Sequence, residues 1–189
     1  MSDPTVLIVE DDEGVAETFR GWLDAYDTRV ALSGSKALEA LDDADIDVVL
    51  LDRLMPGMSG KEVLEEIRER ETGVRVAMVT AVEPGFEVIG MGFDEYVNKP
   101  SSPEELRGIV EKLLSRDGRD EVRREYASLR AKQAALESAK TPRELEDSDE
   151  YSALIERIEE LGDRIDGIDA DLVDETEFLS SLREVEEEG

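Results

Sequence analysis

The run of residues 47 to 60 decides the fold, and it reads Asp-Val-Val-Leu-Leu-Asp-Arg-Leu-Met-Pro-Gly-Met-Ser-Gly. Its four consecutive apolar residues, with Asp on both sides, are typical of a strand that is buried on both faces of a parallel sheet. The Pro-Gly pair predicts a loop. Ser59 stands three residues before Glu62, which predicts the start of a helix with a capping box. The run therefore predicts a strand, a loop and a crossover helix, with Asp52 where the strand ends.

Strand and helix patterns of the same kind alternate from Thr5 to about Ser115. This alternation is typical of βαβ units, so we predict an α/β fold with five strands in a doubly wound parallel sheet. The fourth helix is expected to be short, because Pro and Gly crowd both of its ends. The predicted strands are residues 6–9, 28–31, 47–51, 74–80 and 95–97, and the predicted helices are residues 14–25, 35–41, 60–70, 84–90 and 103–115.

The chain is strongly acidic: its 189 residues include 22 Lys and Arg against 50 Asp and Glu, a formal net charge of -28. Binding to DNA or to an anionic membrane surface requires basic residues, so this charge disfavours both. We expect proteins, cations or small ligands as partners. Extreme acidity is one way in which halophiles keep proteins soluble, and neither a signal peptide nor a membrane span is recognisable. A cytoplasmic location in a salt-rich cell is therefore expected.

Polar side chains follow four of the predicted strands at the point where each strand ends. The sequence has no His and no Cys, so its chemistry must use carboxylates, hydroxyls and lysines. The carboxyl ends of parallel strands meet at one crevice, where several carboxylates would repel one another unless a hard cation such as Mg²⁺ neutralised them. A lysine and a hydroxyl suit a phosphoryl group, with Asp52 as the nucleophile. The residues concerned are Glu10, Asp11, Asp52, Thr80 and Lys99.

Residues 5–115 resemble the receiver domain of two-component response regulators. The resemblance rests on four motifs in order at strand ends: residues 6–12 (VLIVEDD), 52–60 (DRLMPGMSG), 79–81 (VTA) and 96–100 (YVNKP). It implies a flavodoxin-like sheet with strand order 2-1-3-4-5 and a phosphoryl group received from a histidine kinase. It also implies particular site residues: Asp52 as phosphoacceptor, Lys99 and Thr80 near the phosphoryl group, Thr80 and Tyr96 as the switch pair, and Glu10, Asp11, Asp52 and the backbone carbonyl of Leu54 around Mg²⁺.

The segment from residue 116 onward has a different pattern, without strand signals. Its apolar residues at heptad spacing predict two helices that form a hairpin or a coiled coil between chains; they are Leu154, Ile158, Leu161, Ile165, Ile168 and Leu172. A capping box at Thr141 predicts the start of the second helix. Residues 116–143 carry 8 basic and 5 acidic side chains, and residues 144–189 carry 3 and 19. We therefore expect an Arg-rich first helix, with Arg116, Arg119, Arg123, Arg124 and Arg130, to lie against an acidic second one.

Through its place after the receiver, its acidity and the runs at residues 125–129 (EYASL) and 132–136 (KQAAL), this segment is similar to the HalX domain of haloarchaeal response regulators, which gives two predicted domains, 1–115 and 116–189. We expect the helical segment to signal to an unknown downstream protein, and a homodimer through the receiver or the helical arm stays open. One alternative is a transcription regulator that acts at DNA through residues 116–189, although no helix-turn-helix pattern supports direct DNA binding. Another is a Mg²⁺-dependent aspartyl-phosphate phosphohydrolase, but Leu54 stands where such an enzyme needs its acid. We expect a phosphoacceptor and not an enzyme.

Overall fold

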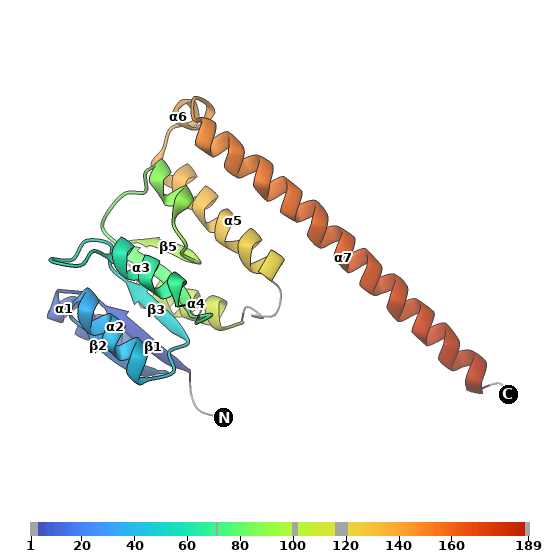
Figure 1. The fold of residues 1–189 in the computed structure, drawn as a ribbon, viewed down its shortest axis with the longest axis horizontal. Helices are drawn as coiled ribbons and strands as arrows, with labels where there is room; N and C mark the ends of the chain where they lie inside the picture. Colours follow the sequence, from blue (N-terminus) through green and yellow to red (C-terminus); the bar gives the residue numbers. More distant parts are fainter. Residues whose placement is uncertain (1–3, 71, 100–101, 116–120, 188–189) are drawn as a thin grey trace.

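The computed structural model describes residues 4–70, 72–99, 102–115 and 121–187, and for residues 169–187 it describes the backbone. A parallel sheet of five strands has the order β2-β1-β3-β4-β5, which confirms the predicted doubly wound fold (Figure 1). The strands are β1 (Thr5–Val9), β2 (Asp27–Ala31), β3 (Val48–Leu51), β4 (Arg75–Thr80) and β5 (Glu95–Asn98), and the helices are α1 (Glu13–Trp22), α2 (Gly34–Asp43), α3 (Gly60–Glu69), the 3₁₀ helix η1 (Phe86–Gly90), α4 (Pro103–Ser115), α5 (Glu121–Ala139), α6 (Pro142–Glu146) and α7 (Asp149–Glu187).

The two faces of the sheet hold two separate apolar layers, because successive side chains of a strand point to opposite faces. On one face, Val6, Ile8 and Leu50 pack with residues of α1 and α4. On the other face, Leu7 and Leu51 pack with residues of α2, α3 and η1. The central strands β1, β3 and β4 are thus covered on both sides, which explains why their sequences are continuous apolar runs instead of alternating ones.

The register of the strands brings the predicted site residues to one edge. Val9 lies opposite Leu51 in the β1–β3 pair, so the residues that follow, Glu10 and Asp52, leave the sheet side by side. Thr80 lies opposite Asn98 in the β4–β5 pair, which places Lys99 next to the end of β4. The topology alone therefore assembles the crevice.

The connection between β4 and β5 differs most from the prediction. A helix was predicted over residues 84–90, but the structure has only the five-residue 3₁₀ helix η1. Pro84 and Gly85 delay its start, and Gly90 and Gly92 prevent its extension, because proline and glycine disfavour a continuous α-helix. The short η1 leaves the neighbouring side of the sheet accessible to another element.

The described part of the C-terminal segment, residues 121–187, contains three helices instead of the predicted two. The predicted capping box is present at Thr141, whose hydroxyl accepts the backbone N–H of Glu144, but α6 is only five residues long. Ser148 then starts α7, because its hydroxyl accepts the N–H of Tyr151. α5 and α7 pack against each other within the chain, as the hairpin alternative predicted.

The expected arrangement of the basic first helix is confirmed in its packing, since α5 lies against α7, but the charge pairs described differ from the expected ones. Arg124 of α5 forms an ion pair with Asp94 of the receiver part. In an ion pair that joins α5 and α7, the basic residue is Arg157 of α7 and the acidic residue is Glu125 of α5. This is the reverse of the expected pairing of a basic first helix with an acidic second one. Arg116 and Arg119 lie outside the described residues.

The heptad seam of α7 is buried in its first half. Leu154, Ile158 and Leu161 are buried, whereas Ile168 is 39% exposed, and the side chain of Leu172 lies outside the described part. Figure 1 shows that α7 extends well beyond the start of α5. None of the helices in the described ranges has the length and the apolar composition needed to cross a membrane.

Candidate functional site

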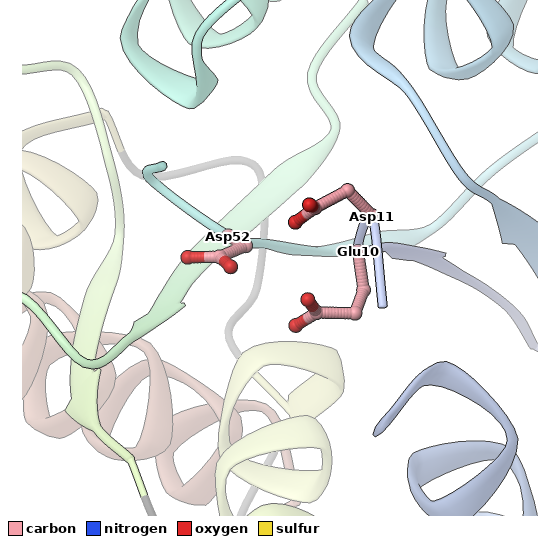
Figure 2. Close-up of side chains that lie close together, drawn as sticks. All are labelled: Glu10, Asp11 and Asp52. Atoms are coloured by element: carbon pink, nitrogen blue, oxygen red, sulfur yellow. The ribbon is translucent and has the colours of Figure 1, made fainter. Parts of the chain in front are cut away.

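Three carboxylates gather where β1 and β3 end. Glu10 and Asp52 are held by the sheet, because the N–H of Glu10 donates to the carbonyl of Ala31 and that of Asp52 to the carbonyl of Val9. Figure 2 shows the side chains of Glu10, Asp11 and Asp52 turned toward the same space. Each offers a carboxylate oxygen, and these oxygens lie within 4.8 Å of one another. Glu10 and Asp52 are buried while Asp11 is exposed, so solvent reaches the cluster at Asp11.

Lys99 supplies the positive charge at this cluster. Its backbone N–H donates to the carbonyl of Thr80, which fixes the residue beside the end of β4. Its ammonium donates to the carboxylate of Glu10 and, at 3.2 Å, to that of Asp52. Lys99 therefore bridges the ends of β1 and β3.

Burial and charge act against each other on the pKa values of this pair. Burial raises the pKa of Glu10, and the hydrogen bond with Lys99 offsets this rise only in part. Burial alone would lower the pKa of Lys99, but its hydrogen bond with Glu10 and the charge of Asp52 raise it above the ordinary value. The ammonium thus stays charged and stabilises the two buried carboxylates.

The carboxylate cluster fits a hard divalent cation. Magnesium binds oxygen ligands at about 2.1 Å in an octahedron, so two opposite ligand oxygens lie about 4 Å apart. The three oxygens of Glu10, Asp11 and Asp52 lie close enough to share such an ion with little adjustment. Leu54, the predicted fourth ligand, lies at the rim, where its N–H donates to Oδ1 of Asp52 at 3.3 Å. Leu54 itself is 67% exposed.

The predicted switch pair lies one layer away, on β4 and β5. Thr80 is fully buried, and its hydroxyl accepts the N–H of Val82 at 3.3 Å. The hydroxyl of Tyr96 donates to the carbonyl of the same Val82 at 2.5 Å. The ring of Tyr96 is half-buried, and its centroid lies 5.5 Å from that of Phe93. Both members of the pair therefore contact the start of the β4–η1 loop.

Arg53 is a residue of the site that the sequence reasoning missed. Its guanidinium binds the carboxylate of Glu87 in η1 at 2.8 Å, and it also lies close to the hydroxyl of Tyr96. The hydrogen bond with Arg53 lowers the pKa of Glu87 below its ordinary value. The only sequence signal was its place directly after Asp52, since no local pattern connects residue 53 with residues 87 and 96.

Comparison with known proteins agrees with this geometry. Residues 6–111 match the family model of the response regulator receiver domain, and residues 115–182 match that of the HalX domain. A solved structure of the response regulator TrrA from Thermotoga maritima in complex with Mg²⁺-BeF is 32% identical, covers 59% of this chain and 99% of its own, and has a TM-score of 0.53. The receiver domain of the Francisella response regulator 1452 is 29% identical over 59% of this chain and 97% of its own, with a TM-score of 0.56.

Two curated relatives have longer chains. A protein of Haloferax volcanii named "Putative transcriptional regulator" is 46% identical over 84% of this chain and 27% of its own length. RegX3 of Mycobacterium tuberculosis, a sensory transduction protein, is 40% identical over 62% of this chain and 53% of its own length. This chain thus spans about a quarter of the first relative and about half of the second. By its motifs, its sheet order and these matches, the chain belongs to the response regulators: it is a receiver domain followed by a HalX domain.

Proposed function

We propose that Asp52 accepts a phosphoryl group from a phosphohistidine of a kinase and that the HalX helices pass the signal to a protein partner. A cytoplasmic location goes with this proposal, since kinases of this class use cellular ATP. The observation that carries the phosphoacceptor role is the position of Asp52: it ends the central strand, its carboxylate is buried among two other carboxylates, and a lysine contacts it.

The residues divide the chemistry of transfer between them. An oxygen of Asp52 attacks the phosphorus atom while the bond from phosphorus to the imidazole nitrogen of the kinase breaks, so the carboxylate becomes an acyl phosphate. Lys99 is placed to bind an oxygen of the incoming group, because its ammonium already lies at 3.2 Å from Asp52. A Mg²⁺ ion held by Glu10, Asp11, Asp52 and the carbonyl of Leu54 would neutralise the charge that accumulates on the phosphoryl oxygens.

Thr80 and Tyr96 are proposed to report the phosphoryl group to the rest of the molecule. The hydroxyl of Thr80 would turn from the N–H of Val82 toward a phosphoryl oxygen. Tyr96 already bonds the carbonyl of Val82, so any shift of the β4–η1 loop, which contains Val82, would also move the ring of Tyr96. The switch therefore acts on the β4–η1 loop and the surface around it.

A protein partner is favoured over DNA as the output because two of the four cationic side chains of α5 are engaged with the receiver part. Arg124 and Lys132 both make contacts with the receiver part, to Asp94 and to the carbonyl of Ile89. Side chains that are engaged in this way do not face a phosphate backbone. The long acidic α7 would repel DNA as well.

Intact-mass measurement tests the phosphoacceptor role. After incubation with acetyl phosphate and Mg²⁺, the wild type should gain about 80 Da, one phosphoryl group on a carboxylate, whereas Asp52→Ala should not. Asp12→Asn is the matched control, because Asp12 is a neighbouring acidic residue whose side chain caps α1 by accepting the N–H of Val15. A gain that persists in Asp52→Ala, or none in the wild type at any Mg²⁺ concentration, would refute the proposal.

A further inference from the structure

One side of α5 carries three hydrogen-bond donors that all reach the receiver part. Arg124, Ser128 and Lys132 follow one another at intervals of four residues, so they lie on one side of the helix. The guanidinium of Arg124 donates to Asp94 at 3.0 Å, and the hydroxyl of Ser128 to the carbonyl of Phe93 at 2.6 Å. The ammonium of Lys132 donates to the carbonyl of Ile89 at 2.9 Å. We refer to these three residues as the docking stripe.

The contacts of the docking stripe are partly buried, which separates them from ordinary surface pairs. Lys132 is only 6% exposed, and its ammonium also lies 5.5 Å from the ring centroid of Phe93. Asp94 is 2% exposed and accepts from Arg68 of α3 in addition to Arg124. Buried charged groups are costly unless they are paired and hydrogen-bonded. The docking stripe therefore favours the one position of α5 on the receiver in which its charged groups are paired.

This seat is next to the proposed switch. Phe93 contacts the ring of Tyr96, with 5.5 Å between the centroids. Ile89 belongs to η1, and η1 also carries Glu87, the partner of Arg53. In Figure 1, α5 lies beside β5 and η1, on the side that the shortened β4–β5 connection leaves open. One series of contacts therefore leads from Tyr96 through Phe93 to α5. A second leads from Arg53 through Glu87 and η1 to α5.

We infer that α5 is the direct reader of the phosphoryl switch and that the docking stripe binds the η1–β5 face more tightly when Asp52 is phosphorylated. The inference rests on the proposed function. The link runs through Tyr96, whose hydroxyl bonds the carbonyl of Val82 and whose ring contacts Phe93, the residue whose carbonyl Ser128 binds. Because coupling between two sites is reciprocal, docking of α5 must in turn strengthen binding of a phosphoryl mimic at Asp52. The η1–β5 face is thereby occupied by the chain's own helix and closed to a second receiver.

A pair of charge reversals on α5 tests the inference in the full-length chain. Lys132→Glu puts a carboxylate next to Asp94 and the carbonyl of Ile89, whereas Arg130→Glu makes the same charge change at an exposed residue that bonds only Gln133 among the described contacts. We expect Lys132→Glu to bind beryllofluoride, with Mg²⁺ present, at least about fivefold more weakly than the wild type. Arg130→Glu should bind it as the wild type does. Arg124→Glu, at the other end of the docking stripe, should weaken beryllofluoride binding in the same way as Lys132→Glu.

Hydrogen exchange gives an independent readout. In the wild type, beryllofluoride should slow amide exchange in residues 121–139, and Lys132→Glu should lose this protection. Equal affinities for the wild type and both stripe variants, or exchange in α5 that beryllofluoride does not change, would overturn the inference while the phosphoacceptor role stands. A wild type that binds no beryllofluoride, as Asp52→Ala should not, would overturn the proposed function and this inference with it.

Discussion

Gly60→Ala should displace the phosphoacceptor, although Gly60 has no functional group. A Cβ atom built on Gly60 would lie 2.1 Å from the carbonyl oxygen of Asp52 and 2.8 Å from the Cα atom of Arg53. Ordinary contacts begin at 3.4 Å, so the loop would have to move by about 1 Å or more to restore normal packing. Both obstructing groups are backbone, so no side chain can rotate out of the way. The end of β3, with Asp52 on it, must therefore shift.

The magnitude follows from two known effects. Forcing an extra carbon into a packed region costs about 1 to 3 kcal/mol of unfolding free energy. A displacement of about 1 Å at a reacting group can slow a reaction about 100-fold, because the alignment of attack is lost. We therefore expect Gly60→Ala to be less stable by about 1 to 3 kcal/mol and to be phosphorylated by acetyl phosphate up to about 100 times more slowly than the wild type.

Urea unfolding and the rate of mass gain measure the two effects in the same preparation. Gly108→Ala is the matched control: it lies inside α4, and a Cβ there meets no atom within 4 Å. It should raise stability by up to about 1 kcal/mol, the preference of a helix interior for Ala over Gly, and leave the phosphorylation rate unchanged. A Gly60→Ala chain with wild-type stability and a wild-type rate would refute the view that this close approach positions Asp52.

Two further predictions concern charged groups. Arg53→Met should raise the pKa of Glu87 back toward its ordinary value, because the hydrogen bond that lowers it is lost; a carbon-13 NMR titration checks this, and an unchanged pKa would contradict the Arg53–Glu87 pair. Burial lowers the pKa of Lys132 in the folded protein below its ordinary value of 10.5. Between this lowered pKa and 10.5, Lys132 is protonated more often in the unfolded chain than in the folded protein. The unfolding free energy of the wild type should therefore rise relative to that of Lys132→Met as the pH approaches 10.5, and parallel urea-unfolding profiles would argue against a buried ammonium.

The sheet and its carboxyl edge could be predicted from sequence because both depend on local patterns. Continuous apolar runs mark strands covered on both faces, and the polar residue that follows each run marks its end. Since parallel strands align their carboxyl ends, Glu10, Asp52 and Lys99 had to meet once the fold class was known. The capping boxes at Ser59 and Thr141 likewise fixed helix starts, because the two hydrogen bonds of each box join residues only three apart.

The contacts of α5 could not be predicted in the same way, because they join residues far apart in the chain. Arg124 and Asp94 are 30 residues apart, and Lys132 and Ile89 are 43. A basic residue on an amphipathic helix is most often solvated, and nothing local distinguishes Lys132, which is buried, from Arg130, which is exposed. The same limit applies to Arg53, whose partner Glu87 comes from the β4–β5 connection.

The packing of α5 also bears on how a signal could leave the receiver. Leu136 of α5, Leu154 and Ile158 of α7, and Phe93 next to β5 belong to one continuous apolar cluster. The predicted boundary near residue 115 therefore divides the sequence, but the apolar core continues across it. Because α5 and α7 share this core, a movement of α5 on η1 and β5 would also move α7. α7 has 39 residues, which makes it about 58 Å long, and a tilt of a few degrees at its buried half would move its far end by several ångströms. A partner that binds the distal part of α7 would thus sense a switch at Asp52 without contacting the receiver.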